Sequence, residues 1–315
     1  MSEHSRSRIR PRPGRRTLSA LAVVAGMVLV GGTLPAAQAA PAEFKYKTYR
    51  VPSANSNPAS MTLGSDGNLW FTEASEFFTP GPDPNGGGTF HSNIGRITPR
   101  GAIAEFRVEG GGFPNDIVQG PGGVLYFTSN PGLGRITTAG VVLPLINAPF
   151  TSGQLAARGN DIWITDFNAD SLWRYDTVSG GFTEVSLSAN SLTDPSDVAV
   201  DSAGNVWFGA TSGSGDVIAR RNPAGNVTTF PVAGDVNAVS IASDGKVWFT
   251  DRFNSTVGFV NPGNGNQVFQ RATLTADAGP RQITAGANGT MWFTQANVGN
   301  AARITADGAT ITEFG

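Results

Sequence analysis

The sequence contains no cysteine. This absence excludes disulfides, a cysteine nucleophile and thiolate metal sites, so the chain must be stabilised by apolar burial and chain closure. Histidine is nearly absent too, with only His4 and His91. No Ser/His/Asp triad or zinc spacing can be assembled, and Gly86-Gly87-Gly88 precedes no helix that would make a phosphate-binding loop. No stretch has the apolar period of a convincing helix.

The first 39 residues have the layout of a secretory signal peptide. Six arginines precede an apolar run from Leu18 to about Leu34, and Ala37-Gln38-Ala39 fits a small-residue cleavage site. An uncleaved membrane anchor is the alternative, since roughly 17 apolar residues could just span a bilayer. The sequence leaves export by the general or the twin-arginine route open. We expect a secreted, extracellular protein that begins at Ala40 and has no membrane attachment after cleavage.

The charge of the mature part limits its partners. Without residues 1–39 the chain carries 16 basic and 23 acidic residues, a net charge of −7. Affinity for nucleic acid depends largely on lysine and arginine that meet phosphates. We therefore expect no nucleic-acid partner. The mature part has about 276 residues, a length that is enough for a large core.

One motif recurs through residues 40–315. A turn glycine precedes an aromatic residue at positions 70, 126, 163, 207, 248 and 292, with gaps of 56, 37, 44, 41 and 44 residues. A period near 40–45 residues is typical of one four-stranded propeller blade. The long first gap contains an insertion rich in glycine and proline, at about residues 74–92.

Each repeat predicts four short strands. The aromatic pair forms the second strand, Gly-Arg-Ile as at Gly95-Arg96-Ile97 forms the third, and an alternating segment such as Ala102 to Phe106 forms the fourth. The fold class is therefore all-β, a single propeller domain of four-stranded antiparallel blades. Both chain ends look like a fourth strand, Lys45 to Val51 and Ala309 to Phe314. We predict six blades, and a degenerate seventh is the alternative.

The recurring aromatic and basic residues have structural interpretations. We expect the motif tryptophans to pack between neighbouring blades. An arginine recurs on the third strand, and five repeats would not each hold an active arginine, so we expect stacking or pairing with the next blade. The arginines are Arg96, Arg135, Arg174, Arg220 and Arg303.

These repeats resemble those of the streptogramin B lyases over nearly all of residues 44–315. The resemblance rests on Gly-x-Leu-Trp-Phe-Thr-Glu at 67–73, Ile-Gly-Arg-Ile-Thr at 94–98 and Gly-x-Ile-x-Glu-Phe at 101–106. It implies a seven-bladed propeller that opens a cyclic depsipeptide by elimination, with Mg²⁺ and a histidine base. In that family the histidines follow a proline where the first strand begins. The matching prolines here, at positions 58, 114, 195 and 280, are followed by alanine, asparagine, serine and arginine.

Chain direction predicts where a site would lie. If the first strand of each blade runs down the channel, the starts of first strands and the ends of second strands share one face. We expect ligand-binding residues at this channel mouth, with the insertion overhanging it. The candidates are Asn115, Asp116, Gln154, Asp197, Asn237, Arg281 and Gln282.

Carboxylates on this face are candidate metal ligands. Carboxylate oxygens suit Mg²⁺ or Ca²⁺, and no organic cofactor is expected. The candidates are Glu73, Asp116, Asp166, Asp197 and Asp251. The alternative is a solvated rim, in which Glu73, Asp166 and Asp251 pair with the third-strand arginines. His91 is expected to be an ordinary loop residue.

Three functions stay open on this basis. One is a lyase acting on a cyclic peptide, ester or lactone, with a metal that polarises a carbonyl and a carboxylate of raised pKa as base. Another is a non-catalytic binding propeller for a small molecule, glycan or protein. The third is a metal-dependent hydrolase resembling the gluconolactonases. Fold alone cannot choose among them. We expect a small molecule or cyclic peptide as the ligand, and a monomer.

Overall fold

The computed structural model describes residues 47–79, 89–110, 112–130, 132–150 and 153–315. The predicted signal peptide and the centre of the predicted insertion lie outside these residues. Within the described ranges, no helix has both the length and the apolarity to cross a membrane. The described residues form strands and three short 3₁₀ turns, Pro121–Gly123, Ser188–Asn190 and Ala287–Gly289.

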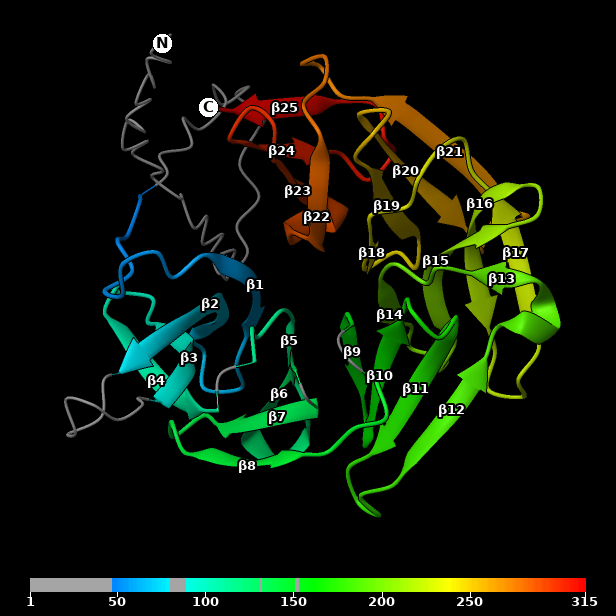
Figure 1. The fold of residues 1–315 in the computed structure, drawn as a ribbon. Coiled ribbons are helices and arrows are strands. Elements are labelled where there is room, and N and C mark those ends of the chain that lie inside the picture. The colour runs from blue at the N-terminus through cyan, green and yellow to red at the C-terminus, as the bar shows by residue number, and fades with distance from the viewer. Residues whose placement is uncertain (1–46, 80–88, 111, 131, 151–152) are drawn as a thin grey trace, which may run out of the picture.

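Six antiparallel sheets surround a central channel (Figure 1), which confirms the predicted all-β propeller and its six blades. The first blade consists of β1 (Pro58–Leu63), β2 (Leu69–Thr79), β3 (Thr89–Ile97) and β4 (Ile103–Glu109). The second consists of β5 (Ile117–Gln119), β6 (Val124–Ser129), β7 (Gly132–Thr137) and β8 (Val142–Ile146). The third consists of β9 (Leu155–Arg158), β10 (Asp161–Asp166), β11 (Ser171–Asp176) and β12 (Phe182–Ser186).

In the fourth blade the innermost strand is divided into β13 (Leu192–Thr193) and β14 (Val198–Val200), which both pair with β15 (Val206–Ser212). Outside them lie β16 (Gly215–Arg221) and β17 (Val227–Pro231). The fifth blade holds β18 (Ala238–Ile241), β19 (Val247–Asp251), β20 (Thr256–Asn261) and β21 (Gln267–Ala272). The sixth holds β22 (Pro280–Ala285), β23 (Met291–Gln295), β24 (Asn300–Ile304) and β25 (Ile311–Phe314). The strands β1, β5, β9, β14, β18 and β22 line the channel (Figure 1).

The flanks of the predicted insertion are strand rather than loop. They extend β2 and β3 as a hairpin in which Phe77 pairs with His91 and Thr79 pairs with Thr89. The expectation that His91 lies in a loop is therefore wrong. The hairpin extends β2 and β3 beyond the length of these strands in the other blades, and His91 is part of this extension. The Nδ1 of His91 lies 3.4 Å from Thr79 Oγ1, and its ring lies 5.5 Å from that of Phe77.

The motif residues stack across each blade. Trp70 of β2 lies directly opposite Arg96 of β3, and the guanidinium lies 5.4 Å from the indole and 5.3 Å from the ring of Phe106. Trp207 with Arg220 and Trp292 with Arg303 repeat the arrangement. Stacking is thus confirmed for three arginines, since delocalised guanidinium groups are attracted to aromatic faces.

The other two arginines bond within their own blades. Arg174 pairs with Asp161 at 2.8 Å, and Arg135 donates to the Pro144 carbonyl at 3.1 Å. Pairing of these two with the next blade is therefore wrong. β8 has no phenylalanine to complete such a stack, and Phe182 of β12 lies opposite Tyr175, with its ring 4.9 Å from the tyrosine ring, rather than beside Arg174. Instead Arg221 of the fourth blade lies 5.6 Å from the Trp163 ring.

The glycine of Gly-Arg-Ile has a packing cause. A Cβ on Gly95 would lie 2.0 Å from the Phe71 ring, and a Cβ on Gly134 would lie 2.0 Å from the Phe127 ring. The phenylalanine of the second strand therefore covers bare backbone on the third. The two glycines are required by close approach.

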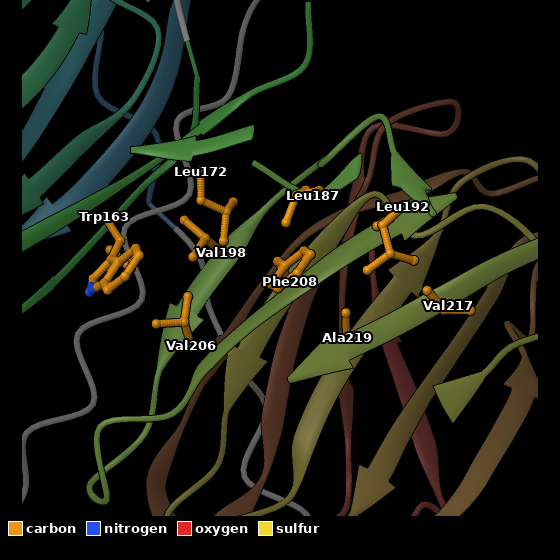
Figure 2. Packing of buried hydrophobic residues seen from close by; sticks show 11 residues of the cluster. Trp163, Leu172, Leu187, Leu192, Val198, Val206, Phe208, Val217 and Ala219 are labelled. Atoms are coloured by element: carbon orange, nitrogen blue, oxygen red, sulfur yellow. The ribbon is translucent and has the colours of Figure 1, made fainter. Parts of the chain in front are cut away.

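The apolar core lies between blades, as predicted for four of the five motif tryptophans, whereas Trp292 is only partly buried and stacks on Phe314 of its own blade. Figure 2 shows Trp163 and Leu172 of the third blade beside Val198, Val206 and Phe208 of the fourth. Trp70, Trp207 and Trp248 are likewise buried in clusters with the following blade. Burial of these large side chains between consecutive blades is a major source of stability.

The segment before β1 packs on the first blade as a fourth strand packs on the next blade. The Tyr49 ring covers Gly101, as Phe106 covers Gly140 and Phe269 covers Gly308. The backbone N–H of Ser53 donates to Glu105 at 2.8 Å, as that of Thr275 donates to Glu313 at 2.9 Å. The predicted strand from Lys45 to Val51 thus has fourth-strand contacts but no ladder in its described residues.

Candidate functional site at the channel mouth

A threonine on each of several second strands fixes the channel mouth. The hydroxyl of Thr72 donates to the Asn115 carbonyl at 3.1 Å, and that of Thr128 donates to Gly153 at 3.0 Å. Thr250 donates to the Arg281 carbonyl at 2.7 Å, which also accepts from Asn237 Nδ2 at 3.0 Å. Each bond joins a blade to the start of the next first strand. The third residue of Trp-Phe-Thr therefore holds the candidate site residues in place.

Asp116 and Asp197 join neighbouring blades through backbone N–H groups. Asp116 accepts from Ile117 N at 2.8 Å, from Leu155 N of the third blade at 2.6 Å, and from the Ser60 hydroxyl. Asp197 accepts from Val198 N at 2.8 Å and from Val239 N of the fifth blade at 2.7 Å. Burial raises the pKa of Asp116, and burial with the nearby charge of Asp116 raises the pKa of Asp197 to about 7. Each carboxylate therefore links the innermost strands of neighbouring blades.

The acidic residues at the ends of second strands also have local partners. Asp166 accepts from Ala169 N and Trp173 Nε1, each at 3.3 Å. Asp251 accepts from Phe253 N, Asn254 N and Asn254 Nδ2, at 3.1, 3.0 and 2.7 Å. These contacts cap the turns that follow β10 and β19. The expectation that they pair with third-strand arginines is wrong, because those arginines stack on aromatic rings or bond to backbone carbonyls and to Asp161 and Asp176.

Glu73 is fully buried within β2 and not at its end as predicted, because β2 continues to Thr79 after a shift of register between Glu73 and Phe77. Its Oε2 accepts from Asn93 Nδ2 at 3.3 Å, not from Arg96. Burial raises its pKa to about 8, and the charge and hydrogen bond of Glu105 add to the rise. A neutral Glu73 carboxyl is the form that this environment favours.

A preformed metal centre is not found in the described part of the chain, where no three histidine, cysteine or acidic side chains are grouped to hold an ion. The five metal candidates lie on different blades, and their carboxylates accept hydrogen bonds from backbone N–H groups, side-chain amides, the Ser60 hydroxyl and the Trp173 indole instead. The residues described therefore do not fit a resident Mg²⁺ or Ca²⁺ as they stand.

A polar cavity of about 480 Å³ opens at the mouth. Four predicted residues line it: Gln154, Asn237, Arg281 and Gln282. The remaining predicted ligand-binding residues, Asn115, Asp116 and Asp197, do not line it. The third to sixth blades build its walls, and the other lining residues are Phe167, Asp194, Ser196, Ala210, Thr211, Asp216, Asp235 and Val236.

Several of these were missed from the sequence for identifiable reasons. Ala210 and Thr211 lie near the end of a second strand, as the rule of chain direction requires, but they carry neither a carboxylate nor a side-chain amide. Asp216 is the second residue of a third strand, and the rule of chain direction covers only first and second strands. Asp194 and Asp235 come before the residues at which the first strands were expected to start. They line the cavity because Asp194 lies in the break between β13 and β14 and Asp235 lies in the loop before β18.

The cavity has an acidic wall and a basic wall. Asp216 Oδ1 accepts from Thr211 Oγ1 at 2.8 Å. Burial raises the pKa of Asp235, and the charges of Asp216 and Asp251 raise it further. Arg281 on the sixth blade is exposed, while its backbone is held by Asn237 and Thr250. The arrangement can bind a dipolar or cationic ligand.

Comparison with known proteins identifies relatives with this architecture. The family model described as the virginiamycin B lyase family matches residues 148–315. A virginiamycin B lyase of Nocardia farcinica is 27% identical over 209 residues, which cover 65% of this chain and 70% of that protein.

Two solved structures are similar in fold. One is a catalytically inactive virginiamycin B lyase from Staphylococcus aureus with quinupristin, at a TM-score of 0.70 and 24% identity, covering 86% of this chain and 88% of that one. The other is a streptogramin B lyase structure, at a TM-score of 0.69 and 24% identity, covering 84% and 85%. At such identities these structural matches establish the fold alone.

Proposed function

This chain belongs to the virginiamycin B lyase family, and on that premise we propose that its mouth cavity binds a cyclic peptide or ester of the streptogramin B kind. One observation carries the proposal: every residue that lines the cavity falls within residues 148–315, the part that matches the family model. The structure with quinupristin belongs to a relative. Binding without turnover is the form of the proposal that we favour.

The chemistry of the walls supports binding. Arg281 and Gln282 from the sixth blade and Gln154 from the third can donate hydrogen bonds to ring carbonyls. Asn237 uses its amide to hold the Arg281 backbone, which orients this wall before a ligand arrives. A volume of about 480 Å³ lies in the range of small-molecule pockets.

Calorimetric titration of the purified protein with quinupristin tests the proposal. We expect saturable binding that Arg281→Ala weakens by at least about tenfold, because a charge-assisted hydrogen bond is worth roughly 1.5–3 kcal/mol. Arg107→Ala is the matched control, since Arg107 pairs with Glu109 on the outer part of the first blade. Equal affinity of both variants and the wild type would place the ligand elsewhere.

Ring opening by elimination is the second candidate function, favoured by Asp235. Its raised pKa suits a carboxylate that accepts a proton. Asp235 would take the proton from the carbon next to a carbonyl. The electron pair of the broken C–H bond would form a carbon–carbon double bond to the neighbouring carbon. The C–O bond between that carbon and the ester oxygen would break, and the acyl group would leave as a carboxylate. Arg281 would stabilise the charge on the carbonyl oxygen.

Mass and chromatography separate these functions. Quinupristin incubated with the protein, with Mg²⁺ or with a chelator, gives a product of unchanged mass but altered retention if elimination occurs. A product heavier by one water indicates the hydrolase related in fold to gluconolactonases. Unchanged quinupristin would exclude turnover, and the calorimetric titration would then decide whether the protein binds it. The prediction of an Mg²⁺ or Ca²⁺ requirement is supported only if the chelator abolishes turnover.

We also propose that the protein is secreted as a monomer. The proposal rests on the arginine-rich start, the apolar run from Leu18 and the Ala37-Gln38-Ala39 site. Expression of the full chain, with sequencing of the product in the medium, should give an N-terminus at Ala40. Light scattering of that product should give the mass of one chain. A product that stays in the membrane fraction would contradict secretion.

A further inference from the structure

We propose that the mouth cavity selects ligands that carry a protonated amine beside an aromatic ring, with the amine on the wall of Asp216 and Asp235 and the ring on Phe167. This inference rests on the proposed function, because it names the ligand class of the same cavity. It adds a cationic group to the carbonyl-bearing ring considered above.

The charge of the lining favours a cation. Asp194, Asp216 and Asp235 line the cavity, and Arg281 is the one basic residue among the described lining residues. Asp194 and Asp216 come from the fourth blade and Asp235 precedes the fifth, whereas Arg281 lies on the sixth. The acids are thus grouped on one wall, and a ligand cation there would reduce their mutual repulsion.

Asp235 is the carboxylate with most capacity for a ligand. Asp216 and Asp194 each accept a threonine hydroxyl, from Thr211 at 2.8 Å and from Thr193 at 2.9 Å. No hydrogen bond to the Asp235 carboxylate is present within the described residues, although the side chain is only half-buried. Its neighbours Asp216 and Asp251 are acidic, so an ammonium group would satisfy an acceptor that the fold leaves open.

Phe167 supplies the aromatic contact. It lines the cavity and is 58% exposed, so much of its ring is accessible to a ligand. Its turn is held by Asp166, which accepts from Ala169 N and Trp173 Nε1. Asp251 holds the corresponding turn of the fifth blade with exposed Phe253. The capped turn therefore presents the ring to the cavity at little entropic cost.

A matched pair of probes isolates the amine. Phenethylamine is charged at pH 7.5 and 2-phenylethanol is neutral, with nearly the same shape. By ligand-observed NMR at low salt, we expect phenethylamine to bind about fivefold more tightly, the difference expected of a partly exposed ion pair. High salt should reduce that difference. Equal affinities at low salt would overturn the inference.

Variants assign the interaction to residues. Asp235→Asn should bring the affinity for phenethylamine down to that for 2-phenylethanol. Phe167→Ala should weaken both probes alike. Asp277→Asn is the control, since Asp277 is exposed in the loop before β22 and does not line the cavity. An equal loss in Asp277→Asn would reduce the effect to overall charge and overturn the assignment.

Titration of quinupristin into the same variants keeps the two proposals distinguishable. If quinupristin binds but phenethylamine shows no preference over 2-phenylethanol, the cavity binds a ring and the amine inference fails. If phenethylamine shows the preference and quinupristin does not bind, the amine site stands and the proposed function fails. Displacement of phenethylamine by micromolar Ca²⁺ would show a metal site instead and would overturn the inference.

Discussion

Glu73 and Glu105 form a carboxyl pair at the edge of the first blade, where Gln295 and Glu313 form an amide–carboxylate pair in the sixth. Gln295 Nε2 donates to Glu313 Oε1 at 2.7 Å. In the first blade only a protonated Glu73 can make the equivalent donation to Glu105, and its pKa is raised to about 8 by burial and by Glu105. Ser53 and Thr275 complete the two sites through backbone donation to Glu105 and Glu313.

This pair predicts a pH-dependent stability. The folded pKa of Glu73 lies above its ordinary value of 4.5. The protonated Glu73 carboxyl therefore makes its full contribution to the free energy of unfolding below about pH 4.5, and this contribution is lost as the pH rises towards 8. Glu73→Gln should supply the donor at every pH. We expect it to raise the free energy of unfolding by at least about 1 kcal/mol at pH 8 and to change it little at pH 4.5, measured by urea denaturation.

The reverse substitution in the sixth blade is the matched control. Gln295→Glu creates a second carboxyl pair, so it should lower stability at pH 8 more than at pH 4.5. A pH-independent change in both variants would show that packing, not ionisation, controls these positions.

Removal of the Asp197 carboxylate should lower the stability of the fold without weakening ligand binding directly. Asp197→Ala leaves the N–H groups of Val198 and Val239 without their carboxylate acceptor, which should cost about 1–3 kcal/mol per unsatisfied group. Thermal denaturation checks the loss of stability. Because Asp197 does not line the cavity, the affinity of the folded variant for quinupristin should stay within about twofold. A large loss of affinity with unchanged stability would make Asp197 a ligand contact.

Close packing at Gly95 predicts a large effect of one methyl group. Gly95→Ala places a Cβ about 2.0 Å from the Phe71 ring, so the ring or the strand must move, at a cost of roughly 1–3 kcal/mol. Gly213→Ala is the control, since a Cβ there meets no atom within 4 Å. Chemical denaturation should separate the two, and equal midpoints would contradict the packing described.

The N-terminal segment predicts a further stability effect. Tyr49→Ala removes the ring that covers Gly101 and should destabilise the first blade by about 2–4 kcal/mol, as other losses of large aromatic contacts do. Phe106→Ala is the comparison variant, because Phe106 covers Gly140 in the same way. Hydrogen exchange should show the loss in β1 and β4 for Tyr49→Ala. An unchanged exchange rate there would mean that residues 47–53 contribute nothing to the first blade.

The family and the fold could be predicted from the repeats. The spacing of the aromatic residues at positions 70, 126, 163, 207, 248 and 292 reflects one blade per repeat. Gly95-Arg96 reflects a phenylalanine that covers a glycine backbone beside a stacked guanidinium. These contacts are local to a blade or join consecutive blades. They leave a period in the sequence because each blade solves the same packing problem.

The composition of the mouth depended on the tertiary structure. The rule of chain direction found Gln154, Asn237, Arg281 and Gln282 but also Asp116 and Asp197, because sequence cannot tell whether a carboxylate at a strand start turns to the solvent or to the N–H of the next blade. It missed Asp235, Asp216 and Phe167, whose meeting depends on the break between β13 and β14 and on turns from three blades. The repeat period of the sequence predicts the strand pairing because every blade uses the same pairing. Which side chains line the cavity depends on how several blades are placed relative to one another, so only the tertiary structure determines them.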